Sequence, residues 1–203
     1  PPADTLRRFW TMIAHYHGQT WNAAEFARSL GTAEATSRKY LDILSGAYVV
    51  RQLQPWFANI KKRQVRAPKV YIRDSGILHA LLGLSDLDEL RGHPKNGASW
   101  EGFVIEQVVS MASTRDFYYW ATHAGAELDL LLFRGGRPIG VEIKYTDSPR
   151  TTRSMRVAMS DLDLDHLYVV HPGQETYPLD DAITALCVAD ISQIVGLRDV
   201  ASS

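Results

Sequence analysis

Two short segments of the chain carry acidic and basic side chains at spacings that suit metal-dependent chemistry. One is Gly125-Ala126-Glu127-Leu128-Asp129, the other is Val141-Glu142-Ile143-Lys144, and Gly135-Gly136 lies between them. A two-residue turn at the glycine pair predicts a β-hairpin. Counting back from that turn along both strands puts Asp129 opposite Glu142 and Glu127 opposite Lys144.

Side chains alternate across a strand, so these four residues are expected on one face of the hairpin. The alternate positions are apolar and are expected to point into a core: Leu128, Leu130, Leu132, Val141 and Ile143. Two carboxylates directly opposite each other destabilise a sheet, and a divalent cation held by oxygen ligands would offset that cost. The hairpin therefore predicts a site for Mg²⁺ or Mn²⁺.

The expected ligands are Asp129, Glu142 and the carbonyl of Ile143, with water completing the shell. An ion held in this way polarises a phosphodiester and lowers the pKa of a bound water that attacks it. Lys144 would orient that water or stabilise the charge that develops on the phosphate. A simpler interpretation stays open, in which Glu127 and Lys144 form an ordinary ion pair and the other two acids face solvent.

A further carboxylate, Glu101, lies in a segment that predicts a helix over residues 99–113. On a helical wheel Glu101 falls among apolar residues such as Ile105 and Val108 rather than on the polar face. Burying an unpaired charge is costly, so Glu101 needs a partner. We expect it to bind the metal, directly or through water, or to bind a second ion. The candidate catalytic residues are therefore Glu101, Asp129, Glu142 and Lys144.

From residue 98 onward the pattern predicts a helix, three strands, a helix and a strand. The expected ranges are 99–113, 116–122, the two hairpin strands, 149–162 and 166–171. The strand over 166–171 is expected to run parallel to the strand of Glu142, because a helix connects them. A strand over 183–188 and a short helix from residue 190 are expected to follow.

The first part of the chain predicts a winged helix-turn-helix. Helices are expected over 5–17, 22–30 and 32–45; Asn22 and Glu25 form a capping box for the second, and Thr32 caps the third after a turn at Gly31. Strands over 48–53 and 69–73 follow, and then a helix from Asp74 or Ser75 to residue 82. Residues 85–97 are rich in Gly, Pro and Asn and predict a mobile connection. We therefore expect one domain over 1–84 and another over 85–203.

Charge separates the two halves of the chain. Residues 1–97 hold 14 Lys and Arg against 8 Asp and Glu, a net charge of +6, and residues 98–203 hold 8 against 15, a net charge of −7. The first half therefore suits a polyanion, with DNA favoured. The expected nucleic-acid contacts are basic and lie on the third helix and in the following loop: Arg38, Lys39, Lys61, Lys62, Arg63 and Arg66. Two alternatives stay open, a helical domain that binds a protein and a solvated basic loop.

Composition excludes several other classes of protein. The single cysteine, Cys187, rules out an internal disulfide and a zinc site built from cysteines. The histidines show no metal-ligand spacing, and no apolar run reaches the roughly 18 residues of a membrane span. We therefore expect a cytoplasmic protein with no membrane partner. The chain starts at Pro1 inside an expected helix, so we expect it to be part of a longer protein.

The combination of Gly-Xaa-Glu-Leu-Asp, a hairpin, Val-Glu-Ile-Lys and a preceding helical Glu resembles the PD-(D/E)XK nuclease superfamily, which has the restriction-endonuclease-like fold. The resemblance matches Asp129 to the family's Asp, Glu142 and Lys144 to its Glu-Xaa-Lys, and Glu101 to its helical Glu. It implies an αβββαβ core and Mg²⁺-dependent phosphodiester cleavage.

A second resemblance covers nearly the whole chain. The winged helix, Pro68-Lys69-Val70-Tyr71-Ile72-Arg73-Asp74-Ser75-Gly76, Trp100-Glu101-Gly102-Phe103-Val104 and Tyr119-Trp120 are similar to a domain of unknown function that follows an AAA+-type ATPase module in many prokaryotic proteins. The P-loop pattern Gly-Xaa₄-Gly-Lys-Ser/Thr is absent from the sequence. The resemblance thus implies a C-terminal portion whose partner is an ATPase module of the same protein.

The predicted fold class is α/β (α+β), with an N-terminal winged helix-turn-helix followed by a restriction-endonuclease-like αβββαβ domain. The predicted function is a metal-dependent nucleic-acid phosphodiester hydrolase module. The alternative is a catalytically silent nuclease-fold domain that binds DNA or docks a protein for the ATPase.

Overall fold

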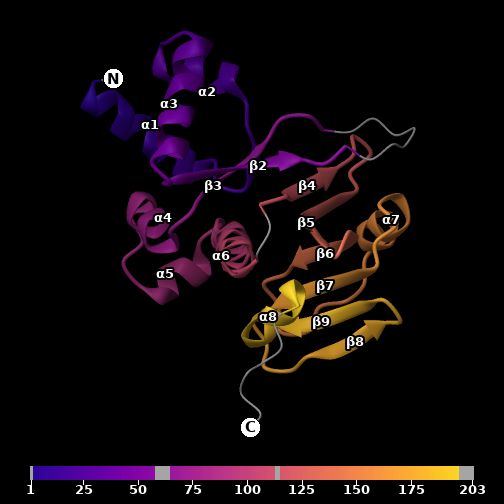
Figure 1. Cartoon of the computed structure of the whole chain (residues 1–203). Helices are drawn as coiled ribbons and strands as arrows, with labels where there is room; N and C mark the ends of the chain where they lie inside the picture. The colour runs from indigo at the N-terminus through magenta and orange to yellow at the C-terminus, as the bar shows by residue number, and fades with distance from the viewer. Residues whose placement is uncertain (1, 58–64, 113–114, 197–203) are drawn as a thin grey trace. The chain divides into compact units, whose positions relative to one another are not determined.

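The computed structural model describes residues 2–57, 65–112 and 115–196. The chain divides into two compact units: unit 1 comprises Pro1–Leu53 and Ala67–Phe103, and unit 2 comprises Gln54–Arg66 and Val104–Ser203. Helices and a mixed parallel and antiparallel arrangement of strands occur together, which confirms the α+β fold class (Figure 1).

Unit 1 packs helices against a small antiparallel sheet. Its helices are α1 (Ala3–His15), α2 (Ala23–Leu30), α3 (Glu34–Gly46), α4 (Ser75–Leu82), α5 (Leu87–Gly92) and the first half of α6 (Asn96–Met111). Its strands are β1 (Gln19–Thr20), β3 (Lys69–Ile72) and β2 (Val50–Pro55), with β3 in the middle. The core includes Tyr40, Leu41 and Leu44 of α3.

Local sequence explains where most of these helices begin and end. The side chain of Asn22 accepts a hydrogen bond from the N–H of Glu25 at 3.3 Å, and Gly31 ends α2 with a φ of 65°, which favours glycine. Asp74 caps α4 by accepting from the N–H of Ile77 at 2.8 Å. The predicted cap of α3 is wrong by one residue, because Ala33 and not Thr32 precedes that helix.

Residues 85–97 differ from the predicted mobile connection. Asp86 accepts hydrogen bonds from the N–H groups of Asp88 and Glu89, so it caps the short helix α5, and α6 already begins at Asn96. The sequence boundary between residues 84 and 85 therefore does not coincide with the edge of unit 1. The start of α6 makes its contacts inside that unit, for example from Ala98 to His17.

Unit 2 is built on a mixed sheet. Its strands are β4 (Phe117–Ala121), β5 (Glu127–Arg134), β6 (Arg137–Ile143), β7 (His166–His171), β9 (Ile183–Cys187) and β8 (Tyr177–Asp180), in that spatial order (Figure 1). The last two residues of β2 extend the sheet beside β4. Strands β6, β7 and β9 are parallel, as expected for β6 and β7, while β4, β5 and β6 are antiparallel.

Helices complete unit 2. Helix α7 (Arg153–Asp161) connects β6 to β7 and contributes Met155 and Ala158 to a core with side chains of β5 and β7. A short 3₁₀ turn (Val188–Asp190) and α8 (Ser192–Val195) follow β9. The elements from α6 to β7 thus run in the predicted order of helix, three strands, helix and strand.

The register of the hairpin follows from its turn. Gly135 and Gly136 have φ angles of 58° and 79°, the conformation of a two-residue turn that twists with its strands. Arg134 pairs with Arg137, and the ladder continues in step to Leu130 and Val141. The predicted register is confirmed over these pairs.

The predicted alternation along β5 is wrong at Leu128. On the β4 side, Tyr118 pairs with Leu131 but Trp120 pairs with Leu128, so β5 holds one extra residue between these pairs. Such a bulge interrupts the two-residue period of a strand. Leu128 and Leu131 consequently lie in the same core cluster beside α7.

Across the described ranges, no helix has both the length and the apolar character needed to cross a lipid bilayer.

Candidate active site

Asp129 lies where β5 and β6 separate. The β5–β6 ladder ends at Leu130 and Val141, and one residue further on Oδ2 of Asp129 accepts a hydrogen bond from the N–H of Ile143 at 2.8 Å. The carboxylate thus takes the N–H that a continuing ladder would give to a backbone carbonyl of β5. Asp129 is buried, with 7% of its surface exposed, so this bond holds the carboxylate in a fixed place.

Glu142 and Lys144 lie next to this point on β6. Glu142 is 5% exposed, and its Oε1 lies 2.7 Å from Nζ of Lys144. Glu142 pairs with Val169 of β7, and the N–H of Lys144 donates to the carbonyl of Val170 at 3.0 Å. Pairing with strand β7 therefore holds the backbone at Glu142 and Lys144 in place. The side chain of Lys144 keeps 41% of its surface exposed.

The carbonyl of Ile143 is oriented toward β5. In an extended strand the N–H and C=O of one residue point to the same side. The N–H of Ile143 reaches Asp129, so the carbonyl of Ile143 is directed to that side as well. The structure thus brings together Asp129, Glu142, Ile143 and Lys144 of the predicted site.

The donor set fits a hard cation in its chemistry. Two carboxylates and one backbone carbonyl are oxygen ligands of the kind that Mg²⁺ and Mn²⁺ take together with water. Within the described ranges, no group of three or more His, Cys, Asp or Glu side chains could hold a metal ion. An ion at this place would therefore rely on the Ile143 carbonyl and on water as well as on the two acids.

Glu101 belongs to unit 1, where it has partners that the sequence interpretation missed. Its Oε1 accepts hydrogen bonds from Nζ of Lys69 at 3.2 Å and from the hydroxyl of Tyr71 at 2.5 Å. Lys69 is buried, with 5% of its surface exposed. The sequence did contain a signal for these partners: Lys69 and Tyr71 are two residues apart on an expected strand, so their side chains lie on the same face. The role of Glu101 at a metal stays a prediction.

A second feature that the sequence interpretation missed is the buried His17. Its Nδ1 accepts from the N–H of Ile72 at 3.0 Å, and Nε2 lies 3.1 Å from the carbonyl of Ala98, so the neutral ring bridges β3 and α6. Burial, together with the nearby charge of Lys95, lowers the pKa of His17 to about 4. A Cβ atom at Gly102 would lie 2.5 Å from Nε2 of His17, so the ring needs a glycine there.

The basic residues predicted to contact nucleic acid have different placements. Arg38 and Lys39 are exposed on α3, with Arg38 3.5 Å from Oε2 of Glu34, and Arg66 is exposed as well. Lys61, Lys62 and Arg63 lie outside the described residues. The exposure of Arg38 and Lys39 agrees with a surface role, and nucleic-acid contact by them stays a prediction.

Comparison with known proteins gives two family matches. Residues 1–88 match a domain of unknown function (DUF8612), and residues 96–191 match another domain of unknown function (DUF4143). The predicted resemblance to a domain of unknown function is confirmed in part, since two such domains match the chain where one was predicted. The two descriptions name no activity.

Two curated relatives are similar over most of the chain. Uncharacterized protein Rv2008c of Mycobacterium tuberculosis and uncharacterized protein Mb2031c of Mycobacterium bovis are each 56% identical over 185 residues. The alignments cover 91% of this chain but only 42% of each relative, so the chain spans about two fifths of their length. No solved structure gives a significant match.

Proposed function

We propose that unit 2 is a metal-dependent phosphodiester hydrolase module with Mg²⁺ or Mn²⁺ as its ion. One observation carries the proposal: two buried carboxylates, Asp129 and Glu142, lie with Lys144 at the place where β5 and β6 separate. Burying two acids is costly for stability, so such a pair is retained at positions where function needs it.

The residues of this site have separate roles in the proposed hydrolysis. When bound, the cation neutralises charge on the phosphate and lowers the pKa of the attacking water. Asp129 and Glu142 bind it in a fixed geometry, because Ile143 and Lys144 hold one oxygen of each carboxylate. The partly exposed ammonium of Lys144 contacts a phosphate oxygen of the substrate and stabilises the charge that develops there.

The proposed substrate is nucleic acid, with DNA favoured. The order α2, tight turn at Gly31, α3 and then β2 and β3 is that of a winged helix, the finer fold that we propose for unit 1. Arg38 and Lys39 project from the surface of α3, which is the helix that reads DNA in that fold. Unit 1 would bind the polyanion and unit 2, with its nuclease-like fold, would cleave it.

The test is a cleavage assay with the chain, Mg²⁺ or Mn²⁺, and single- and double-stranded DNA and RNA. Lys144→Ala and Glu142→Gln should lower the cleavage rate by about 100-fold or more, the scale of a lost charge-stabilising group. Asp163→Asn is the matched control, because Asp163 is an exposed acid of the same unit. Cleavage at equal rates in all four proteins, or in none, would refute the proposal.

A second candidate is a catalytically silent domain with the same fold. Its support is the absence, in the part of the chain that the structure describes, of a cluster of three ligand side chains. In that case the Glu142–Lys144 pair is a structural ion pair. Electron paramagnetic resonance of added Mn²⁺ separates the two: binding that is lost in Glu142→Gln supports the hydrolase, and absence of binding supports the silent domain.

We also propose an ATPase module of the same protein as partner. The proposal rests on the resemblance to domains that follow AAA+-type ATPases. Its test is cleavage by the longer protein with and without ATP, in which ATP should change the rate.

A further inference from the structure

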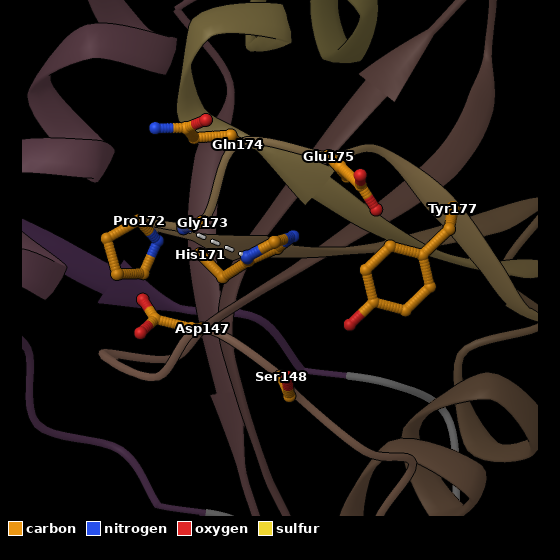
Figure 2. A pocket seen from close by; sticks show the side chains of 8 residues that line it. All are labelled: Asp147, Ser148, His171, Pro172, Gly173, Gln174, Glu175 and Tyr177. Carbon is orange, nitrogen blue, oxygen red and sulfur yellow. Dashed lines mark hydrogen bonds between the residues drawn. The ribbon is translucent and has the colours of Figure 1, made fainter.

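A hollow of about 650 Å³ opens beside the proposed hydrolase site in unit 2. Figure 2 shows the side chains that border it, which come from the segment after β6, the end of β7, the loop that leads to β8 and the first residue of β8. The hollow thus lies at the carboxyl ends of two parallel strands, where α/β sheets bind ligands. Ile143 pairs with Val170, so Lys144 and His171 leave the sheet from neighbouring positions.

His171 supplies a buried donor to this hollow. The N–H of Gly173 donates to Nδ1 of His171 at 3.1 Å, so the neutral ring carries its proton on Nε2. His171 is 1% exposed, and within the described ranges its Nε2 has no hydrogen-bond partner. Figure 2 shows Nε2 on the side of the ring that faces Glu175 and Tyr177. A ligand with an acceptor atom at this place would satisfy a donor that is costly to leave buried.

The loop around His171 is held in place by its neighbours. The hydroxyl of Thr176 lies 2.5 Å from Oδ2 of Asp190 and accepts from the N–H of Cys187 at 3.0 Å. A Cβ atom at Gly173 would lie 2.8 Å from Nδ1 of His171 and 3.1 Å from the carbonyl of Asp147. The hollow is therefore a formed feature of the fold that requires glycine at position 173.

The chemistry of the lining selects the ligand. Two exposed carboxylates, Asp147 and Glu175, disfavour a phosphate inside the hollow itself and accept from N–H donors, while Nε2 of His171 donates and the Tyr177 ring offers an aromatic face. Guanine presents this combination in one ring, with the O6 acceptor beside the N1–H and N2–H donors. A guanidinium group has the donors but has neither the acceptor nor the stacking ring.

We propose that this hollow binds a guanine base of the substrate strand, next to the phosphate that Lys144 contacts; this inference rests on the proposed function. Nε2 of His171 donates to O6, and Glu175 accepts from N1–H and N2–H. Glu175 is exposed on its loop, so its side chain has room to turn as the base enters. Tyr177 packs against the base.

The test is binding of GMP, AMP, CMP and UMP to the chain in EDTA, measured by calorimetry and by the ¹⁵N signal of His171 Nε2. GMP should bind about 5- to 150-fold more tightly than the other three, the discrimination of a bidentate base contact, and should shift the Nε2 signal. Glu175→Gln should remove that preference, while Asp163→Asn should keep it. Binding of free arginine as tight as that of GMP would overturn the proposal in favour of a protein partner.

Equal binding of all four nucleotides, or binding of none by the wild-type chain, would also overturn it, and neither outcome depends on how a variant folds. Binding in EDTA separates this inference from the hydrolase. Lys144→Ala should keep the preference for GMP even though it loses cleavage. Guanine binding without cleavage would refute only the hydrolase, and cleavage without preference for guanine would refute only the hollow.

Discussion

The carboxylate of Asp129 accepts the N–H of Ile143 at 2.8 Å, which ties the end of β5 to β6 through a side chain where their backbone ladder has stopped. The arrangement opens the two strands and places an acid in the opening. A side chain that replaces a backbone acceptor in this way affects both folding and chemistry, and the two effects can be measured separately.

Asp129→Ala should lower the free energy of unfolding of the chain by about 1–3 kcal/mol, because the buried N–H of Ile143 loses its acceptor. Asp129→Asn keeps an acceptor oxygen and should cost less, but it removes the charge and should abolish Mn²⁺ binding. Urea denaturation and Mn²⁺ titration measure the two effects. Full Mn²⁺ affinity in Asp129→Asn would contradict the assignment of Asp129 as a ligand.

The buried contact of Lys69 with Glu101 predicts a strong thermodynamic coupling. Lys69→Met alone should cost about 2–4 kcal/mol of unfolding free energy, because it leaves a mostly buried carboxylate without its nearest cation. The double variant Lys69→Met with Glu101→Gln should recover a large part of that loss. A double-mutant cycle in urea measures the coupling, and strictly additive losses would show that the two residues act independently.

The free energy of unfolding should decrease as the pH is lowered, because of His17. Burial lowers its pKa in the folded chain to about 4 from the ordinary 6.5, so the unfolded chain takes up a proton first as the pH falls. This contribution is complete above pH 6.5 and is lost between pH 6.5 and 4, on the order of 3 kcal/mol in total. Urea denaturation at several pH values should show a shallower decline in His17→Gln, and the exposed His15→Gln should behave as wild type.

Two glycines of α6 should respond in opposite ways to alanine. Gly102→Ala places a Cβ atom 2.5 Å from the His17 ring and should destabilise unit 1 by about 1–3 kcal/mol or more. Gly97→Ala meets open space and should stabilise by about 0.4–1 kcal/mol through the unfolded state. Thermal unfolding of both variants checks the pair; equal effects would contradict the packing of His17 against α6.

Removal of Arg38 and Lys39 should weaken DNA binding uniformly across sequences. Each phosphate contact that is lost should lower the slope of log affinity against log salt by about 1. Arg91→Ala is the matched control, since Arg91 is an exposed helical arginine 3.5 Å from an acid, as Arg38 is. Fluorescence anisotropy over a salt series measures the slopes. An unchanged slope in Arg38→Ala with Lys39→Ala would place the contacts elsewhere.

The hairpin could be predicted from the sequence because its determinants are local. The pair Gly135-Gly136 favours a two-residue turn, because both glycines adopt a positive φ without strain, and that turn sets the register of the residues on either side. The nearness of Asp129, Glu142 and Lys144 was predicted in the same way, by counting from the turn, although the backbone ladder itself stops at Leu130 and Val141.

Two of the features that the sequence interpretation missed depend on residues far apart in the chain. The bulge in β5 appears only when β4 is laid beside it, and Lys69, one partner of Glu101, lies 32 residues earlier. Such features follow from tertiary packing rather than from local preference. Helix α5 was missed for a local reason: it is short and surrounded by Gly and Pro, so its cap at Asp86 was outweighed by turn-forming residues.

The extra residue in β5 changes the register on only one side of the strand. The pairing with β6 is regular from Arg134 to Leu130, whereas the pairing with β4 is offset by one residue before Leu128. Asp129 lies within this offset, so backbone pairing with β4 or β6 does not fix the direction of its side chain. Deletion of one residue there would restore continuous pairing along β5 and would point the Asp129 carboxylate in a different direction.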